Sequence, residues 1–380
     1  MSMLIKNARL VSPDMDIPSA AVEIENGLIK AIYPNGAALP SCDDIYDADG
    51  KMVVPGFIDM HFHGGMGYEI TSQDPRAVGI ILEAKLREGV TSCCPTTLTL
   101  SEERLAESLG NIEAYRKNPT GSKVIGTHLE GPFINPMCAG AQNPSFLRNP
   151  DADELARLAA ISKVSVITYA AELDKDGSFT AAVCRQGILP SCGHTNATAA
   201  EFRTVMANGL HRLTHFCNQM TKLHHREIGL VGEGLFEDSV YLEMICDTIH
   251  LAPDMIALTF KVKPIDRILL ITDAMEATGL PNGDYQIGGL AVVVSDGAAR
   301  LASNGALAGS TLQYNTALKN VLAITGKPIS EVIKTTSWNQ ARELGISNLG
   351  KIEPGFIADL AVLDNDFNVT SVFTDGTKRF

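Results

Sequence analysis

Positive charge is scarce in this sequence, and the shortage limits the classes of ligand that the protein can bind. The 380 residues include 31 Lys and Arg against 44 Asp and Glu, which gives a formal net charge of −13. Proteins that bind nucleic acid present a basic face to the phosphate backbone, so this composition argues against a nucleic-acid partner. Taken by itself, the net charge also argues against anionic ligands.

Long apolar runs are missing as well. No segment reaches the roughly 18 consecutive apolar residues of a membrane span, so we expect no membrane partner. The hydrophobic fraction of 45% and the charged fraction of 20% are typical of a folded globular chain, whereas disorder needs fewer apolar residues. The length allows one large α/β domain with a smaller companion.

Cysteine pairs with a recognisable spacing are also absent. None of the eight cysteines forms a Cys-x-x-Cys pair, and a chain of this length offers no disulfide framework. We expect the cysteines to be reduced and mostly buried. The first residues also lack the long apolar region of a signal peptide. Together these features predict a cytoplasmic protein.

Both ends of the chain have β patterns. Apolar and polar residues alternate around Asn26-Gly27, and Asn-Gly readily adopts the positive φ angles of a type I′ hairpin turn. Near the other end, Phe356–Leu363 and Val369–Thr374 are predicted strands, and Asp375-Gly376 supplies a second hairpin turn. Short isolated hairpins are only marginally stable in water, so one small β domain built from both ends is expected.

The middle of the chain, residues 55–349, alternates β-branched runs with helical patterns, which leaves residues 1–54 and 350–380 for the small β domain. Eight strands that alternate with helices predict the α/β class and a parallel (β/α)₈ barrel. An open doubly wound sheet is the alternative, but no Gly-x-Gly-x-x-Gly follows the early strands. The predicted strands are Gly56–His61, Thr91–Thr96, Val124–Glu130, Val164–Ala170, Ile188–His194, Arg212–Phe216, Val240–Cys246 and Ile268–Asp273.

Residues suited to metal binding gather where these strands end, which is where barrel enzymes place their chemistry. His61 and His63 are two residues apart on one strand, so their side chains point to the same face. Neutral imidazole and carboxylate groups suit zinc and other borderline divalent ions. The candidate ligands, at the ends of five strands, are His61, His63, Glu130, His194, His215 and Asp273.

Each candidate also has a structural interpretation. A single His at a strand end is more often a hydrogen-bonded structural residue, and Glu130 could pair with Arg148. The pairs Cys192-x-His194 and His215-x-Cys217 could form a closed Cys₂His₂ zinc site, although that site leaves the other candidates unexplained. His128 is expected to lie beside the metal ligands rather than among them.

A basic loop directly follows the candidate ligand His215. The segment 218–227 contains Lys222, His225 and Arg226, and a solvated surface loop is the ordinary interpretation of such a run. Beside a metal ligand it is also a candidate phosphate clamp, because Arg matches phosphate oxygens with two parallel hydrogen bonds. The net charge therefore does not exclude a single small phosphate.

These patterns resemble the amidohydrolase superfamily and, within it, the N-acetylglucosamine-6-phosphate deacetylases. The Leu-Glu-Gly-Pro-Phe run is fairly specific to the deacetylases, whereas Pro-Gly-x-x-Ala-Asp-Leu belongs to the superfamily at large. The matching segments are Val54–Gly64, His128–Ile134, Gly193–Thr195, Leu270–Met275, Leu307–Ser310 and Pro354–Leu360.

The resemblance implies a metal-bearing (β/α)₈ barrel with a small β-sandwich made from both termini. It implies that Glu130, His194 and His215 hold a divalent metal, with zinc favoured and iron as the other candidate. One or two ions per subunit are expected. The residues expected to hold a second ion are His61, His63, Glu130 and Asp273.

The resemblance also implies the catalytic roles. Asp273 would be the acid and base, and His250 would polarise the acetyl carbonyl of the substrate. Asn218 and the Gln219 backbone would contact the sugar phosphate.

The resemblance further implies a homodimer in which Arg226 reaches into the neighbouring active site, with His225 as a helper. Ala141 and Leu307 are further expected substrate contacts. Gln142 is another, although it stands where many relatives have His.

The implied activity is removal of the acetyl group from N-acetylglucosamine 6-phosphate. The N-acetylgalactosamine 6-phosphate deacetylases are an alternative, because they share the style of the basic loop and the two sugars differ only at the C4 hydroxyl. Another amidohydrolase, acting on a cyclic amide or deaminating a base, is a further alternative; many of those enzymes use a carbamylated lysine where this chain has Glu130. A binding protein without activity would have lost metal ligands, and none is missing here.

Overall fold

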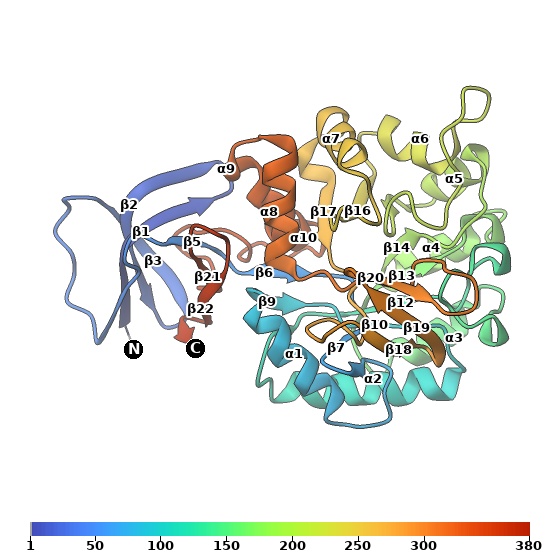
Figure 1. The fold of residues 1–380 in the computed structure, drawn as a ribbon, viewed down its shortest axis with the longest axis horizontal. Helices are drawn as coiled ribbons and strands as arrows, with labels where there is room; N and C mark the ends of the chain where they lie inside the picture. The colour runs from blue at the N-terminus through green and yellow to red at the C-terminus, as the bar shows by residue number, and fades with distance from the viewer. Residues whose placement is uncertain (1) are drawn as a thin grey trace.

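The computed structural model describes residues 2–380 and shows two parts of unequal size (Figure 1). The smaller part holds both ends of the chain, which lie close together. Its strands pair in one sheet in the order β23-β22-β21-β5-β1-β2-β3, with β4 paired to β1. These strands are β1 Ser2–Ser12, β2 Met15–Glu25, β3 Leu28–Pro34, β4 Asp44–Asp47, β5 Met52–Pro55, β21 Leu360–Leu363, β22 Val369–Thr374 and β23 Thr377–Lys378.

The two predicted hairpins are confirmed. Asn26 and Gly27 have φ angles of 51° and 80° between β2 and β3, and Asp375 and Gly376 have 48° and 71° between β22 and β23. The two turns pack together, because a Cβ on Gly27 would lie 3.1 Å from the Asp375 carbonyl oxygen. Strand pairing thus joins both chain ends in a single sheet, so the sandwich of two sheets and the exact domain boundaries stay predictions.

The larger part is a curled parallel sheet with helices around it (Figure 1). Every predicted barrel strand overlaps an observed one, in two ladders ordered β10-β12-β13-β14-β15-β16-β17 and β11-β9-β6. No ladder between β17 and β6 is present among the described residues; there the Asp273 amide donates to the His61 carbonyl at 2.8 Å. Closure into a complete barrel therefore stays a prediction. The strands are β6 Phe57–Asp59, β9 Val90–Cys93, β10 Thr96–Thr97, β11 Lys123–Val124, β12 Thr127–Glu130, β13 Val164–Tyr169, β14 Leu189–Cys192, β15 Arg212–Leu213, β16 Tyr241–Ile245 and β17 Ile268–Ile271.

Local side chains define several helix starts. The Ser101 hydroxyl accepts the Arg104 amide at the start of α2, and Thr198 forms a capping box with Glu201 at the start of α5. No helix among residues 2–380 is both long and apolar enough to cross a membrane. The helices are α1 Ala77–Arg87, α2 Glu102–Lys117, α3 Ala152–Ala159, α4 Ser178–Arg185, α5 Ala199–Met206, α6 Gly229–Phe236, α7 Pro253–Val262, α8 Tyr314–Thr325, α9 Ile329–Val332 and α10 Trp338–Glu343.

Two small β elements near the carboxyl ends of the sheet were not predicted. A short hairpin joins β7 Gly64–Gly65 and β8 Tyr68–Glu69, and a meander comprises β18 Gly283–Ile287, β19 Leu290–Ser295 and β20 Ala298–Leu301. The meander packs its inward side chains against Leu98 and Met275 in a small apolar core of its own. It therefore forms a wall over one side of the sheet end where the candidate ligands lie.

Candidate active site

A pocket of about 300 Å³ opens at the carboxyl ends of the parallel strands. Ile287 and Ala306, from the meander and the segment after it, form part of its wall. Most of the predicted site residues line it, although their positions in the sequence span more than half of the chain. The predicted residues in its lining are His63, Glu130, Ala141, Gln142, His194, His215, Asn218, Gln219, His250, Asp273 and Leu307.

One group of three side chains has the geometry of a metal site. The Nε2 atoms of His194 and His215 are 3.0 Å apart, and they lie 3.3 Å and 3.1 Å from Glu130 Oε1. In a tetrahedral zinc site, ligand atoms about 2.0–2.1 Å from the ion lie about 3.3–3.4 Å from one another. The three residues therefore fit a divalent cation in both donor chemistry and spacing.

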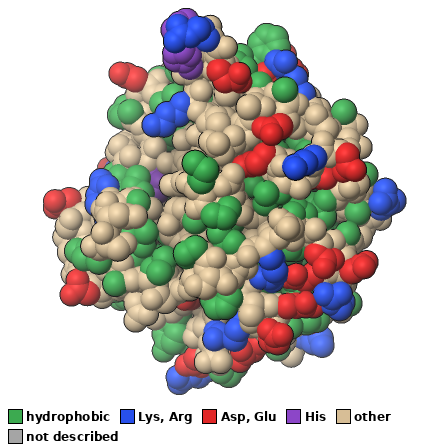
Figure 2. All heavy atoms as spheres, turned by 90° about the vertical axis from the view of Figure 1, so that its right-hand side faces the viewer, with side chains coloured by type: hydrophobic (Ala, Val, Ile, Leu, Met, Phe, Trp, Pro, Cys, Tyr) green, Lys and Arg blue, Asp and Glu red, His purple; other side chains and the backbone are tan. Residues whose placement is uncertain are grey.

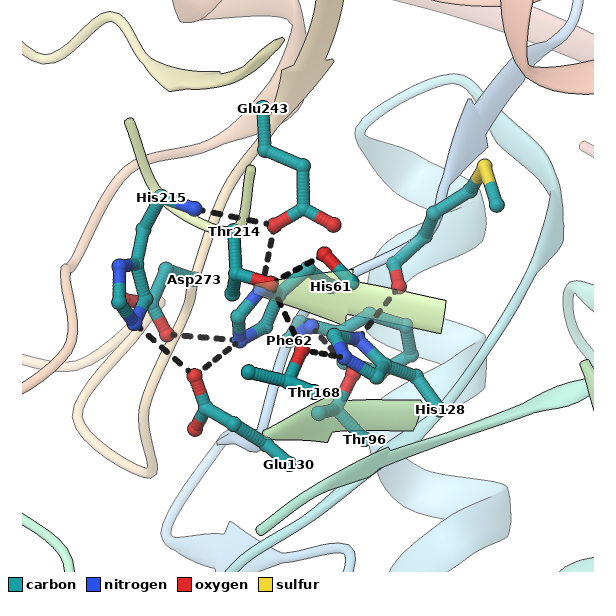
Figure 3. A network of polar contacts seen from close by, with 12 residues as sticks. His61, Phe62, Thr96, His128, Glu130, Thr168, Thr214, His215, Glu243 and Asp273 are labelled. Carbon is teal, nitrogen blue, oxygen red and sulfur yellow. Dashed lines mark hydrogen bonds and ion pairs between the residues drawn. The ribbon is translucent and has the colours of Figure 1, made fainter. Parts of the chain in front are cut away.

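A second group lies directly beside the first. His63 Nε2 is 3.3 Å from His61 Nε2 and 3.2 Å from Asp273 Oδ1. Glu130 joins the two groups, because its Oε1 is 3.3 Å from His61 Nε2 and its Oε2 is 3.1 Å from His63 Nε2. Figure 3 shows His61, Glu130, His215 and Asp273 pointing toward one another from the ends of different strands.

The electrostatics of this cluster favour positive charge. Burial alone would lower the pKa of His63, but its hydrogen bonds to Asp273 and Glu130 and the charges of both carboxylates raise it to about 9. Burial would raise the pKa of Asp273, but the two neighbouring histidines lower it below its ordinary value. A divalent cation would supply the positive charge that these carboxylates favour.

The backbone at the site adopts conformations that are rare for residues other than glycine. His194, His215 and Asp273 have φ angles of 48°, 32° and 50°. Residues other than glycine seldom occupy this left-handed region, because it strains the backbone. Backbone strain of this kind is concentrated at functional sites. Each strand ends just before one of these residues, so the strained turn aims the side chain into the pocket.

A charged residue that the sequence reasoning missed holds His61. Glu243 lies within β16, and its Oε2 accepts a hydrogen bond from His61 Nδ1 at 2.8 Å and from the His215 amide at 3.2 Å (Figure 3). Its Oε1 is 3.0 Å from Arg212 Nε. Burial opposes ionisation, yet Arg212 and His61 hold the pKa of Glu243 far below its usual range. The signal in the sequence was a single acidic residue inside the apolar run Tyr241–Ile245.

A buried lysine supports the same strand ends from outside the sheet. Lys85 Nζ on α1 lies 3.1 Å from Asp59 Oδ2 and 3.0 Å from Thr272 Oγ1. Asp59 Oδ1 in turn accepts the amides of His61 and Thr272, each at 3.3 Å. The network thus ties α1 to the residues immediately beside two of the candidate ligands.

His128 lies beside these two groups and belongs to neither, although it forms a third possible ligand set with His61 and Glu243. Its ring nitrogens contact Thr168 Oγ1 at 2.7 Å and the Met60 carbonyl at 3.2 Å (Figure 3). Burial lowers the pKa of His128 to about 3, and the neighbouring His61 adds to the effect. It is a neutral, hydrogen-bonded residue of the core.

The structure decides two of the alternative interpretations. Arg148 does not pair with Glu130, because its Nε lies 2.9 Å from Glu154 Oε2. Among residues 2–380, the groups that could hold a metal contain no cysteine. Burial raises the pKa of Cys192 and that of Cys217 to about 12 each, as is typical of buried structural cysteines.

His250 is fixed on the pocket wall by a neighbouring carboxylate. Its Nδ1 is 2.6 Å from Asp247 Oδ2, and Asp247 Oδ1 accepts the His250 amide at 2.8 Å. One ring nitrogen is therefore engaged by Asp247, and the other is available to a ligand in the pocket.

The basic loop lies apart from the pocket of its own chain. Arg226 and His225 are exposed and contact each other, with Arg226 Nη1 2.7 Å from His225 Nε2. Neither residue lines the pocket, whereas Asn218 and Gln219 do. The side chain of Gln219 packs against Gly140, where a Cβ would come within 3.2 Å of it.

Comparison with known proteins defines the class. The profile of the Amidohydrolase family matches residues 52–378. The chain therefore belongs to the amidohydrolase family and is an amide hydrolase.

Within that family the similarity is to deacetylases of N-acetylated sugar phosphates. The N-acetylglucosamine-6-phosphate deacetylase of Lysinibacillus sphaericus is 33% identical over 369 residues, which cover 96% of this chain and 94% of the relative. The N-acetylgalactosamine-6-phosphate deacetylase of Escherichia coli O157:H7 is 33% identical over 380 residues and 99% of both chains. The crystal structure of N-acetylglucosamine-6-phosphate deacetylase from Thermotoga maritima superimposes with a TM-score of 0.89 at 35% identity, covering 100% of this chain and 99% of that chain.

Proposed function

We propose that the protein hydrolyses the N-acetyl group of N-acetylglucosamine 6-phosphate and releases acetate and glucosamine 6-phosphate. The observation that carries the proposal is the convergence of Glu130, His194 and His215 in one pocket with Asp273 and His250. The deacetylase relatives, which span nearly the whole chain, support the choice of substrate.

Glu130, His194 and His215 would hold the main divalent cation, with zinc as the favoured ion and iron as the other candidate. His61, His63 and Asp273, together with Glu130, would hold a second ion, so one or two ions per subunit are proposed. A divalent cation at such a site lowers the pKa of a bound water to about 7 and polarises a carbonyl.

Asp273 is proposed as the general base and then the general acid. Its carboxylate lies on the pocket wall, with Oδ1 3.2 Å from His63 Nε2 in the second group of candidate ligands. It would accept a proton from the attacking water and return that proton to the amine nitrogen as the C–N bond breaks. The water's hydroxyl stays on the acetyl carbon, so atoms and charge balance between substrate and products.

His250 is proposed to stabilise the developing negative charge on the acetyl oxygen. Asp247 holds the imidazole by one nitrogen, so the ring keeps a fixed orientation during the reaction. Ala141, Gln142 and Leu307 are proposed to line the position of the sugar.

The phosphate is proposed to bind at Asn218 and the Gln219 backbone. Arg226, with His225 beside it, would complete the phosphate site from the second subunit of a homodimer, because in its own chain it lies outside the pocket. Complete closure of the (β/α)₈ barrel, a terminal β-sandwich and a cytoplasmic location are part of the same proposal. All eight cysteines are free, which agrees with a reducing compartment.

N-acetylgalactosamine 6-phosphate is the second candidate substrate, because the E. coli O157:H7 relative with that activity matches 99% of both chains. Acetate release from the 6-phosphates of N-acetylglucosamine, N-acetylgalactosamine and N-acetylmannosamine, measured in parallel, decides between them. We expect the highest kcat/KM for N-acetylglucosamine 6-phosphate. A higher value for the galactosamine compound would overturn the choice of sugar while leaving the chemistry in place.

A further inference from the structure

We propose that Gln142 is a positioning residue that fixes the carboxylate of Glu130 for metal binding. Gln142 Nε2 lies 2.5 Å from Glu130 Oε2, and both side chains are buried in the pocket wall. The inference rests on the proposed metal site, and it gives Gln142 a role beyond contact with the sugar.

The orientation of the Gln142 amide is determined by its second partner. Its second partner is the backbone N–H of Thr99, which lies 2.7 Å from Gln142 Oε1. A backbone N–H can only donate, so the side-chain atom that faces it must be the amide oxygen, which accepts. The amide nitrogen must therefore face Glu130, whose ionised carboxylate only accepts. Both contacts are satisfied by one rotamer, so the Gln142 side chain is held from both ends.

The loop that carries Gln142 is itself anchored. The backbone N–H of Gln142 donates to the Ala139 carbonyl at 2.9 Å, and Arg148 Nη1 donates to the Leu100 carbonyl at 2.9 Å. Asn135 Nδ2 donates to Glu172 Oε1 at 2.7 Å on the other side of the loop. The position of Gln142 is thus set by the protein before any ligand arrives.

The hydrogen bond divides the two oxygens of Glu130. Oε1 faces the Nε2 atoms of His194 at 3.3 Å and His215 at 3.1 Å, where the main cation would bind. Oε2 receives the Gln142 N–H and lies 3.1 Å from His63. Gln142 therefore keeps Oε1 turned toward the main site and prevents rotation of the carboxylate about its last bond.

A residue that orients a metal ligand affects metal affinity even when no substrate is present. Loss of such a contact typically costs about 10–100-fold in metal affinity. A residue that contacts only the sugar changes KM and leaves metal affinity unchanged. The two roles can therefore be separated without an activity measurement.

The test measures zinc affinity of the metal-stripped protein by competition with a chromophoric chelator. Gln142→Met keeps the length of the side chain but removes its donor, and Gln142→Asn keeps an amide that is too short to join Thr99 and Glu130. Leu307→Ala is the matched control, because Leu307 lines the same pocket and is not among the candidate metal ligands. Thermal unfolding of each stripped variant checks that the fold is retained.

We expect the dissociation constant for the tightest zinc ion to rise 10–100-fold in both Gln142 variants and to change less than threefold in the control. Turnover of the Gln142 variants should then recover as zinc is raised. Unchanged zinc affinity together with a raised KM would overturn the inference and make Gln142 a sugar contact. If the wild-type protein bound zinc but released no acetate, the proposed function would fail, and the affinity comparison would still decide the role of Gln142.

Discussion

At the scale of single residues, Glu130 is the centre of the site, because both of its oxygens contact histidine nitrogens. Oε1 meets His194 and His215, and Oε2 meets His63. Asp273 lies on the other side of His63 and contacts neither His194 nor His215 in the first group. Metal binding at the main site and proton transfer are therefore assigned to different carboxylates, and this assignment can be tested.

Asp273→Asn should separate the two functions. The amide cannot accept a proton from water, so we expect kcat to fall by about 10²–10⁴-fold. The zinc ion held by Glu130, His194 and His215 should remain, since Asp273 is outside that group. Turnover and the metal-to-protein ratio are the measurements, and Asp254→Asn on the exposed start of α7 is the control. Near-normal turnover in Asp273→Asn would contradict the assignment.

The candidate ligands could be predicted from the sequence, because they lie directly after apolar strands whose carboxyl ends must meet. The supporting residues could not. Glu243 appears in the sequence only as one acidic residue in a strand, and its bond to His61 depends on a contact between residues 182 positions apart. Gln142 was predicted to contact the sugar, which stays a prediction, and its hydrogen bond to Glu130 was not predicted.

At the scale of secondary structure elements, α1 is tied to the sheet by charge as well as by apolar packing. Lys85 is almost fully buried and contacts Asp59, Glu88 and Thr272. Removing one partner of a buried ion pair leaves the remaining charges without compensation, which typically costs 3–5 kcal/mol.

Lys85→Met should therefore lower the free energy of unfolding by about 3–5 kcal/mol, measured by urea denaturation. Lys117→Met is the control, because Lys117 is exposed in the last turn of α2, and its effect should stay within about 0.5 kcal/mol. A loss below about 1 kcal/mol in Lys85→Met would show that the network does not hold α1 in place.

The sequence patterns predicted the presence of most strands and helices correctly, but they predicted the residues at which the strands end less well. The predicted strand Arg212–Phe216 pairs only at Arg212–Leu213, because His215 adopts a φ of 32° that no strand residue can take. The meander β18–β20 was missed, although Asp296-Gly297 at its second turn is a hairpin signal. Its strands cover only a small apolar core with Leu98 and Met275, and that core is assembled from distant parts of the chain.

At the scale of the whole molecule, the net charge of −13 describes the average surface and not the site. Figure 2 shows acidic and basic side chains intermixed on one face of the larger part. Binding of a small anion therefore depends on local groups, and the loop with His225 and Arg226, which follows Asn218 and Gln219 in the sequence, is the proposed source of positive charge.

Arg226→Ala should raise KM for the phosphorylated sugar by about 10–100-fold and leave KM for the unphosphorylated sugar nearly unchanged, because a charge-assisted hydrogen bond is worth about 1.5–3 kcal/mol. The proposed dimer makes a second outcome testable. Mixing Arg226→Ala with Asp273→Asn chains should restore activity, since one site of each mixed dimer combines an intact Asp273 with an intact Arg226. No gain on mixing, together with equal effects on both sugars, would contradict the shared phosphate site.

The most direct test of the central claim is acetate release from N-acetylglucosamine 6-phosphate by the protein as isolated, stripped of metal, and resupplied with zinc. We predict one acetate and one glucosamine 6-phosphate per substrate consumed, loss of this activity on stripping, and its recovery with zinc. Undiminished acetate release by the stripped protein, or no release by the zinc-loaded protein, would contradict the account.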